Sequence, residues 1–184
     1  DDILSASRNM AKRYRCNTSH GQKIENYALQ IFDAMKKFHG LGTRERLLLQ
    51  IASILHDCGK FISLRDSSAC AYNIIMATEI IGLSHAEREI VAEVVRCNLD
   101  AFRYGEGSIR AGKLTAMLRL ANAMDRSHHG RLDDGKLQVK GNKLIISTSY
   151  AGNLALETMA VEDKADFFEE MFGIRPEIRQ KRRV

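Results

Sequence analysis

The residues with the clearest chemical potential are His56 and Asp57, which follow an apolar helical run from Leu47 to Leu55. A neutral imidazole and a carboxylate can bind one divalent cation together. Adjacent side chains on a helix point about 100° apart, so they reach one ion only near a helix end. Gly59 gives the chain the freedom to end the helix there. A His-Asp pair at a helix C-terminus can also occur by chance. Whether this pair binds a metal therefore depends on which other side chains the fold places next to it.

The elements that would position this pair are mostly helices, because apolar residues recur at helical spacing through the first 130 residues. We expect helices over 2–15, from His20 to 38 after an N-cap at 17–19, and from Thr43 to His56. A connection over 61–68 and a loop over 100–108 separate the later helices. Those helices are expected over 69–81, after a Ser84/Glu87 capping box, and over 109–124.

The pattern changes after residue 130. Short apolar runs at 137–139 and 144–146 flank Gly141-Asn142, which predicts a β-hairpin. We expect a third strand at 154–159, a helix over 161–171 and an edge strand at 174–178. The sequence therefore predicts a mainly α protein: a helical domain over 1–130, followed by a small α+β tail over 131–184.

Composition sets outer limits on function. The 184 residues are 45% hydrophobic and 28% charged, and no apolar run approaches 18 residues, so we expect no membrane-spanning helix. The net charge of +5 favours a polyanionic partner. Aromatic residues are few and not interleaved with basic ones, which argues against a nucleic-acid partner.

The cysteines and the first residues bear on the setting of the protein. The chain begins with Asp1, without an initiator Met or a signal pattern, so we expect a piece of a longer chain. The cysteines form no C-x-x-C pair and indicate reduced thiols in a cytoplasmic protein. They are Cys16, Cys58, Cys70 and Cys97.

Four motifs together carry a family resemblance that covers nearly the whole chain. They are Tyr14-x5-His20, Ile54-Leu55-His56-Asp57-x-Gly59-Lys60, Gly82-Leu83-Ser84-x-x-Glu87-Arg88 and Leu118-Arg119-Leu120-Ala121-Asn122-Ala123-Met124-Asp125-Arg126-Ser127. The sequence resembles the HD superfamily of metal-dependent phosphohydrolases. More narrowly, it resembles the C-terminal region of the exopolyphosphatase/guanosine pentaphosphate phosphatase (Ppx/GppA) family. The resemblance implies an HD-type helical bundle followed by a small α+β subdomain.

The resemblance also implies a metal-ligand set of His20, His56, Asp57 and an Asp near residue 122. This chain has Asn122 there, which offers a carbonyl oxygen without charge. Asp125, one turn later, could replace it only if the helix or the ion is displaced. Since hard cations depend on ligand charge, we expect a divalent ion (Mn, Mg, Zn or Fe) to be weakly bound or absent.

A second departure from the family concerns histidines. The family often has a His-rich stretch after the HD motif, whereas this chain has Asp66-Ser67-Ser68-Ala69-Cys70-Ala71-Tyr72. A binuclear centre would therefore lack ligands. We expect His85 to be a solvated helix-start residue, and His128 and His129 to be loop residues rather than ligands.

Two basic residues near the motifs are candidates for holding phosphate oxygens. Lys60 would act as a point charge and Arg126 as a planar fork, with ordinary surface charge as the alternative. The basic run 179–183 is either a solvated tail or part of a polyanion path.

The predicted function is that of an accessory domain. In the resembling family, exopolyphosphatase chemistry belongs to an N-terminal actin-like ATPase-fold module whose motifs these residues lack. We expect this region to help bind polyphosphate or a guanosine polyphosphate, to associate as a homodimer, and to be inactive alone. The alternative is a self-sufficient HD phosphohydrolase that uses His20, His56, Asp57 and Asp125. A third reading is a structural dimerisation domain with an exposed apolar face in the 69–97 helices.

Overall fold

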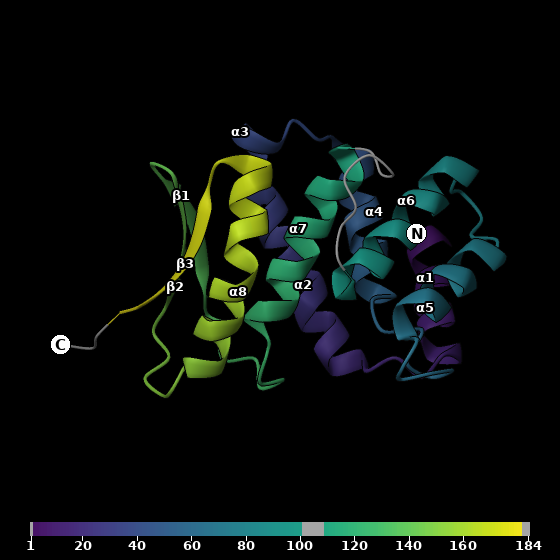
Figure 1. Cartoon of the computed structure of the whole chain (residues 1–184), viewed down its shortest axis with the longest axis horizontal. Helices are drawn as coiled ribbons and strands as arrows, with labels where there is room; N and C mark the ends of the chain where they lie inside the picture. The colour runs from purple at the N-terminus through teal and green to yellow at the C-terminus, as the bar shows by residue number, and fades with distance from the viewer. Residues whose placement is uncertain (1, 101–108, 182–184) are drawn as a thin grey trace.

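The computed structural model describes residues 2–100 and 109–181 as a helical bundle with a small sheet at one side (Figure 1). Most of the predicted 100–108 loop therefore lies outside the described residues. The mainly α fold with a small α+β part is confirmed. In chain order the elements are α1 Asp2–Arg13, α2 Thr18–Ala34, α3 Lys36–His39, α4 Thr43–Ile54, α5 Ser67–Ala77, α6 His85–Leu99, α7 Ile109–Met124, β1 Lys136–Lys140, β2 Lys143–Thr148, α8 Ala155–Phe172 and β3 Arg175–Gln180.

The helix starts follow the predicted capping chemistry. The Asn17 side chain accepts a hydrogen bond from the backbone N–H of His20 at 3.1 Å, which begins α2. Ser84 and Glu87 form the expected reciprocal capping box at the start of α6. The helix predicted to reach residue 38 is shorter, because α2 ends at Ala34 and α3 follows as a separate short helix.

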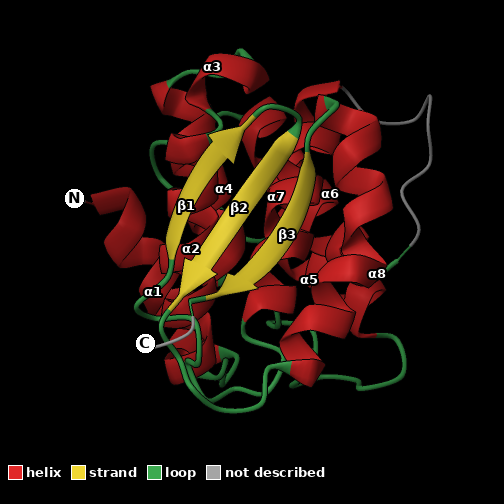
Figure 2. Ribbon diagram, turned by 90° about the vertical axis from the view of Figure 1, so that its left-hand side faces the viewer, coloured by secondary structure: helices red, strands yellow, loops and turns green. Residues whose placement is uncertain are grey.

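The sheet has the order β1-β2-β3 and lies against the helices on one face. Figure 2 shows its other face toward the viewer, with the helices behind it. β1 and β2 form the predicted hairpin, in which Gly141 adopts φ +60°. β3 runs parallel to β2, with Lys143 opposite Arg175, so α8 must carry the chain back along the sheet. The predicted edge strand is thus confirmed.

The predicted third strand at 154–159 is wrong, because that segment forms the first turns of α8. The buried residues of this helix are Glu157, Val161, Ala165 and Phe168, which are spaced by three or four positions. That spacing matches one face of a helix, and it begins inside the segment predicted as a strand. The short apolar run at its start conceals this helical period.

The buried core runs through both the bundle and the tail. One continuous cluster contains Tyr27 and Met117 from the bundle together with Ile146 and Phe168 from the tail. The division after residue 130 stays a prediction. None of the helices in the described ranges is long and apolar enough to cross a membrane.

Candidate functional site

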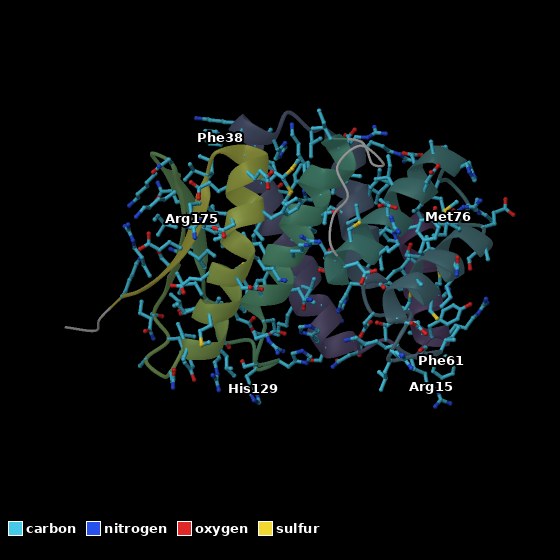
Figure 3. All side chains as sticks on the ribbon, in the orientation of Figure 1. Arg15, Phe38, Phe61, Met76, His129 and Arg175 are labelled. Carbon is cyan, nitrogen blue, oxygen red and sulfur yellow. The ribbon has the colours of Figure 1, made fainter. Side chains whose placement is uncertain are left out.

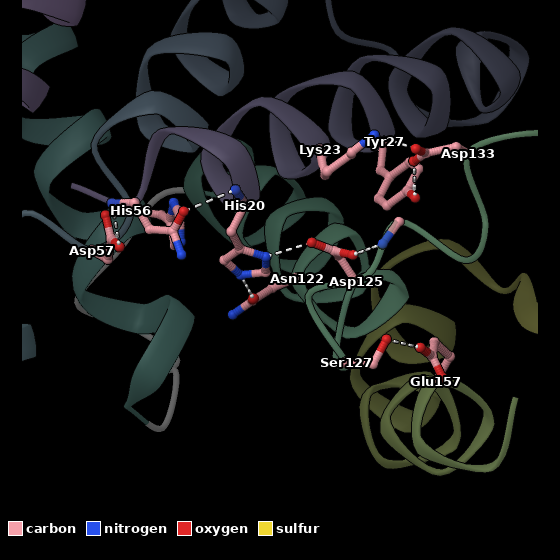
Figure 4. Close-up of polar contacts among 12 residues, drawn as sticks. His20, Lys23, Tyr27, His56, Asp57, Asn122, Asp125, Ser127, Asp133 and Glu157 are labelled. Carbon is pink, nitrogen blue, oxygen red and sulfur yellow. Dashed lines mark hydrogen bonds and ion pairs between the residues drawn. The ribbon is translucent and has the colours of Figure 1, made fainter.

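The five predicted ligand residues gather where helix ends meet at one end of the bundle (Figure 4). His20 lies in the first turn of α2, and His56 and Asp57 lie in the turn that follows α4. Asn122 is in the last turn of α7, and Asp125 follows it. The imidazole rings of His20 and His56 meet edge-on, with centroids 5.4 Å apart. The fold therefore brings together residues that are up to 105 positions apart in the sequence.

Gly59 allows the His-Asp turn to form in this place. A Cβ atom built on Gly59 would lie 1.9 Å from the carbonyl oxygen of Ser67 and 2.7 Å from the amide nitrogen of Ala71. Both atoms are backbone atoms of α5, so no side-chain movement could relieve the contact. Glycine is required at this position because α5 packs directly on the turn that carries His56 and Asp57.

His20 is held by hydrogen bonds at both ring nitrogens. Its Nδ1 lies 2.6 Å from Asp125 Oδ2, and its Nε2 lies 3.1 Å from Asn122 Oδ1. The other carboxylate oxygen of Asp125 accepts from the backbone N–H of Gly130 at 2.9 Å. Burial acts to raise the pKa of Asp125, but the hydrogen bonds from His20 and Gly130 outweigh it and hold that pKa below its ordinary value. His20 and Asp125 thus form a buried, charge-assisted pair.

Among the described residues, His56 and Asp57 each have one side-chain polar atom with a hydrogen-bond partner and one without. Nδ1 of His56 donates to the carbonyl oxygen of Ser53 at 2.8 Å, while its buried Nε2 has no partner among the described residues. Burial lowers the pKa of His56, so the ring is neutral and Nε2 is an acceptor. Oδ2 of Asp57 accepts from the backbone N–H of Asn17 at 3.3 Å, and its buried Oδ1 is unpartnered in the described part of the chain.

These residues, as arranged, do not fit the ligand set of a divalent ion. Both nitrogens of His20 and both oxygens of Asp125 are already engaged in hydrogen bonds. Across residues 2–100 and 109–181, no group of three or more His, Cys, Asp or Glu side chains is placed to hold a metal ion. Asn122 also differs from the expected ligand, because an amide does not supply the charge of a carboxylate. Metal binding by these residues stays a prediction.

His128 is one of the site residues that the sequence did not identify. It lies in the turn after α7 with φ +61°, and its ring stacks on His20 with centroids 3.6 Å apart. Burial and the neighbouring His20 lower the pKa of His128. Position 128 is a loop position, as expected, and no local sequence pattern indicates that the turn folds back over α2. By contrast, His129 points outward at the same end of the protein (Figure 3).

A cavity of about 410 Å³ opens beside the histidines and collects positive charge. Lys60 and Arg126, the two predicted phosphate-binding residues, both line it. Two further cations, Arg119 and Lys164, were not predicted, and Asp163 is the acidic residue among the described lining residues. Among the described residues, the lining consists of His20, His56, Lys60, Asn98, Arg119, Asn122, Ala123, Arg126, His128, Ala160, Asp163 and Lys164.

Other predicted residues lie away from this cavity. His85 begins α6, as expected, and contacts Arg88. In the basic run, Arg179 and Gln180 belong to β3, and Gln180 donates to the carbonyl oxygens of Tyr150 and Gly152. Residues 182 and 183 lie outside the described residues. The first part of the run is therefore an ordered strand, and its role toward polyanions stays a prediction.

The connection after the His-Asp turn contacts the turn that follows α1. The guanidinium group of Arg15 lies 5.3 Å from the centre of the Phe61 ring, and Figure 3 shows the two side chains together at this end of the protein. Such a cation–π contact is worth about 0.5–1 kcal/mol at an exposed site. It helps to hold the segment that follows Lys60.

Comparison with known proteins identifies the family of the chain. The family model described as Ppx/GppA phosphatase, domain III, matches residues 4–162. The chain is also 24% identical over 157 residues to a guanosine-5'-triphosphate,3'-diphosphate pyrophosphatase of Photobacterium profundum. That alignment covers 82% of this chain and 32% of the relative, so the chain spans about a third of the relative's length. The predicted family resemblance is confirmed: the chain belongs to the Ppx/GppA phosphatase family and corresponds to its domain III.

Proposed function

We propose that this domain is an accessory polyanion-binding part of a Ppx/GppA-type hydrolase, taking polyphosphate or a guanosine polyphosphate. The observation that carries the proposal is the cavity, which four cationic side chains line against one carboxylate among the described residues. Lys60 and Arg126 are exposed at its wall and available to phosphate oxygens. Arg119 adds charge while it donates to the carbonyl oxygen of Cys97 at 2.8 Å. The name of the relative is consistent with a phosphoanhydride substrate for the longer protein.

The test is a titration of the chain with inorganic polyphosphate at low salt. Lys60→Ala and Arg126→Ala should each weaken binding about fivefold, because a charge pair near 4 Å in water is worth about 1 kcal/mol. Lys136→Ala, which removes an exposed cation from the sheet, is the matched control. Binding should also weaken steeply as salt increases. Equal affinities for the wild type and both cavity variants would refute the cavity as the binding site.

The rival enzyme reading is less well supported. A self-sufficient HD phosphohydrolase would need an open coordination site around His20, whose two nitrogens are engaged by Asp125 and Asn122. The discriminating assay is phosphate release from nucleotides and polyphosphate by this chain alone with added Mn²⁺. Turnover that disappears in a His56→Ala/Asp57→Ala variant would establish the rival.

Association with other modules is a further part of the proposal. The expected partners are an N-terminal actin-like ATPase-fold module of the same cytoplasmic protein and a second copy of the chain. The purely structural reading required an exposed apolar face in the 69–97 helices. Among the described residues of that range, Ile81 is the exposed large apolar side chain. Sedimentation of the chain, alone and with the module, measures both associations.

A further inference from the structure

Asn98 has an unsatisfied amide within the cationic cavity. The residue is only 5% exposed and lies near the end of α6, where it contributes to the cavity lining. Neither its Oδ1 nor its Nδ2 has a hydrogen-bond partner among the described residues. A buried amide without partners is unfavourable by about 1–3 kcal/mol, and most buried side-chain polar atoms in proteins are paired. The position therefore carries a polar group that the described part of the folded chain does not use.

The surroundings of Asn98 hold it in place without satisfying it. Arg119 donates to the backbone carbonyl oxygens of Cys97 and Asp100, on either side of Asn98. These bonds fix the end of α6 against α7. They leave the Asn98 side chain within the cavity, and the Arg119 donors that make them are directed to backbone oxygens.

A second unsatisfied group lines the same cavity. Nδ1 of His56 lies 2.8 Å from the carbonyl oxygen of Ser53, and the opposite ring nitrogen, Nε2, faces away from that contact. That nitrogen is buried and has no partner in the described part of the chain. The cavity thus presents one buried acceptor, Asn98 Oδ1, and one buried donor, Asn98 Nδ2, beside the unpartnered ring nitrogen of His56.

This combination distinguishes between two kinds of phosphate ligand. An ionised inorganic polyphosphate is almost entirely an acceptor, so it can satisfy Asn98 Nδ2 and the cations but not the buried acceptor, Asn98 Oδ1. A nucleoside phosphate carries the same phosphate oxygens together with sugar hydroxyl and base N–H donors. A cavity of about 410 Å³ also falls in the usual range of about 300–1,000 Å³ for small-ligand sites.

We propose that Asn98 makes this cavity selective for nucleoside phosphates over inorganic polyphosphate, by pairing with a hydroxyl or N–H donor of the nucleoside. The inference rests on the proposed function, since the phosphate groups would lie among the cations described above. It narrows the ligand class to phosphates that also carry hydrogen-bond donors. Asn98 is then a ligand-contacting residue rather than part of the structural framework.

The test compares two ligands with the same number of phosphates. GTP and inorganic tripolyphosphate are titrated into the wild-type chain at one ionic strength, with EDTA present so that metal bridging does not contribute. GTP should bind at least about tenfold more tightly, which corresponds to about 1.4 kcal/mol. Asn98→Leu, which keeps the approximate volume and removes both polar atoms, should lose most of that difference. It should weaken tripolyphosphate binding less than GTP binding, since tripolyphosphate loses only the Nδ2 donor and keeps the cations.

Two controls separate ligand contact from a structural role. Asn26→Leu makes the same change at an exposed position outside the cavity and should leave both affinities unchanged. The melting temperature of free Asn98→Leu should equal or exceed that of the wild type, because an unpaired buried amide has been replaced by an apolar group. A marked fall in melting temperature would show that Asn98 is structural and overturn the inference.

The remaining outcomes distinguish this inference from the proposed function. Equal binding of GTP and tripolyphosphate overturns the selectivity but keeps the polyanion site. Tighter GTP binding that survives in Asn98→Leu overturns the role of Asn98. Absence of binding by either ligand overturns the proposed function and this inference with it. Tighter GTP binding that is lost in Asn98→Leu alone supports both.

Discussion

Removing the carboxylate of Asp125 should destabilise the whole bundle, not only the site. This side chain is 1% exposed and pairs with a histidine that is 5% exposed. In Asp125→Ala two hydrogen bonds disappear: the bond to His20 Nδ1 at 2.6 Å and the bond from the Gly130 N–H at 2.9 Å. The first leaves Nδ1 of a buried imidazole without its hydrogen-bond partner, and the second leaves a turn amide unpaired.

The magnitude follows from these two contacts. Hydrogen bonds to charged groups contribute about 1.5–3 kcal/mol each, so loss of the two bonds to the Asp125 carboxylate costs about 3–6 kcal/mol. His20 retains its contact with Asn122, which favours the lower end of this range. We therefore expect the free energy of unfolding to fall by about 3 kcal/mol. With a urea dependence of about 2–3 kcal/mol per M, the unfolding midpoint should fall by about 1–1.5 M.

Urea unfolding at pH 7, followed by circular dichroism, measures this change. Asp166→Ala is the matched control, because its carboxylate is 87% exposed and pairs with Arg175 at the surface. Surface ion pairs contribute about 0–1 kcal/mol, so the control should unfold near the wild-type midpoint. A loss below about 1 kcal/mol in Asp125→Ala would show that the pair with His20 does not hold the helix ends together.

Three further predictions concern the turn, the histidines and the metal. Gly59→Ala should lower the free energy of unfolding by about 1–3 kcal/mol through overpacking. Gly21→Ala is the control: its added Cβ would meet no atom within 4 Å, so inside α2 it should raise the free energy of unfolding by about 0.5–1 kcal/mol. Similar urea midpoints for the two variants would contradict the close contact between Gly59 and α5. Burial lowers the pKa of His39 and His56, so the unfolded chain takes up protons first as pH falls below about 6.5. The free energy of unfolding should therefore fall as pH decreases below about 6.5, by up to about 1.4 kcal/mol per pH unit for each histidine. A free energy of unfolding that stays constant between pH 7 and 5 would contradict this prediction. Elemental analysis after incubation with Mn, Mg, Zn or Fe and desalting should find well under one equivalent of metal, and Asn122→Asp should increase retention by restoring a carboxylate beside His20.

The sequence predicts most of the fold because local signals and the tertiary structure agree. Asn17, Ser84 and Glu87 begin helices through contacts within three residues, which a sequence displays directly. The segment 154–159 does not reveal its helix, because its apolar start is too short to show a period. The burial of Val161 and Phe168 against the bundle and sheet decides in favour of the helix.

The site could be predicted as a set of residues but not as an arrangement. Spacing and family resemblance identified His20, Asn122 and Asp125, yet the pairing of His20 with Asp125 depends on how the chain turns after α7. The stacking of His128 on His20 depends on the same turn, in which position 128 adopts a left-handed conformation. No sequence motif marks Asn98. Its interest comes from the folded structure, where its buried amide has no hydrogen-bond partner among the described residues.

The cavity draws its walls from separate stretches of the chain, including those around His20, His56–Lys60, Asn98 and Asn122–His128. No single stretch can form it, so the cavity exists only while the bundle is folded. A ligand that spans these walls binds the native state alone, and its binding free energy adds to the free energy of unfolding. At about 100 times its dissociation constant, such a ligand would stabilise the protein by about 2.7 kcal/mol. The melting temperature of the chain is therefore itself a reporter of occupancy, and it can identify ligands without an enzymatic assay.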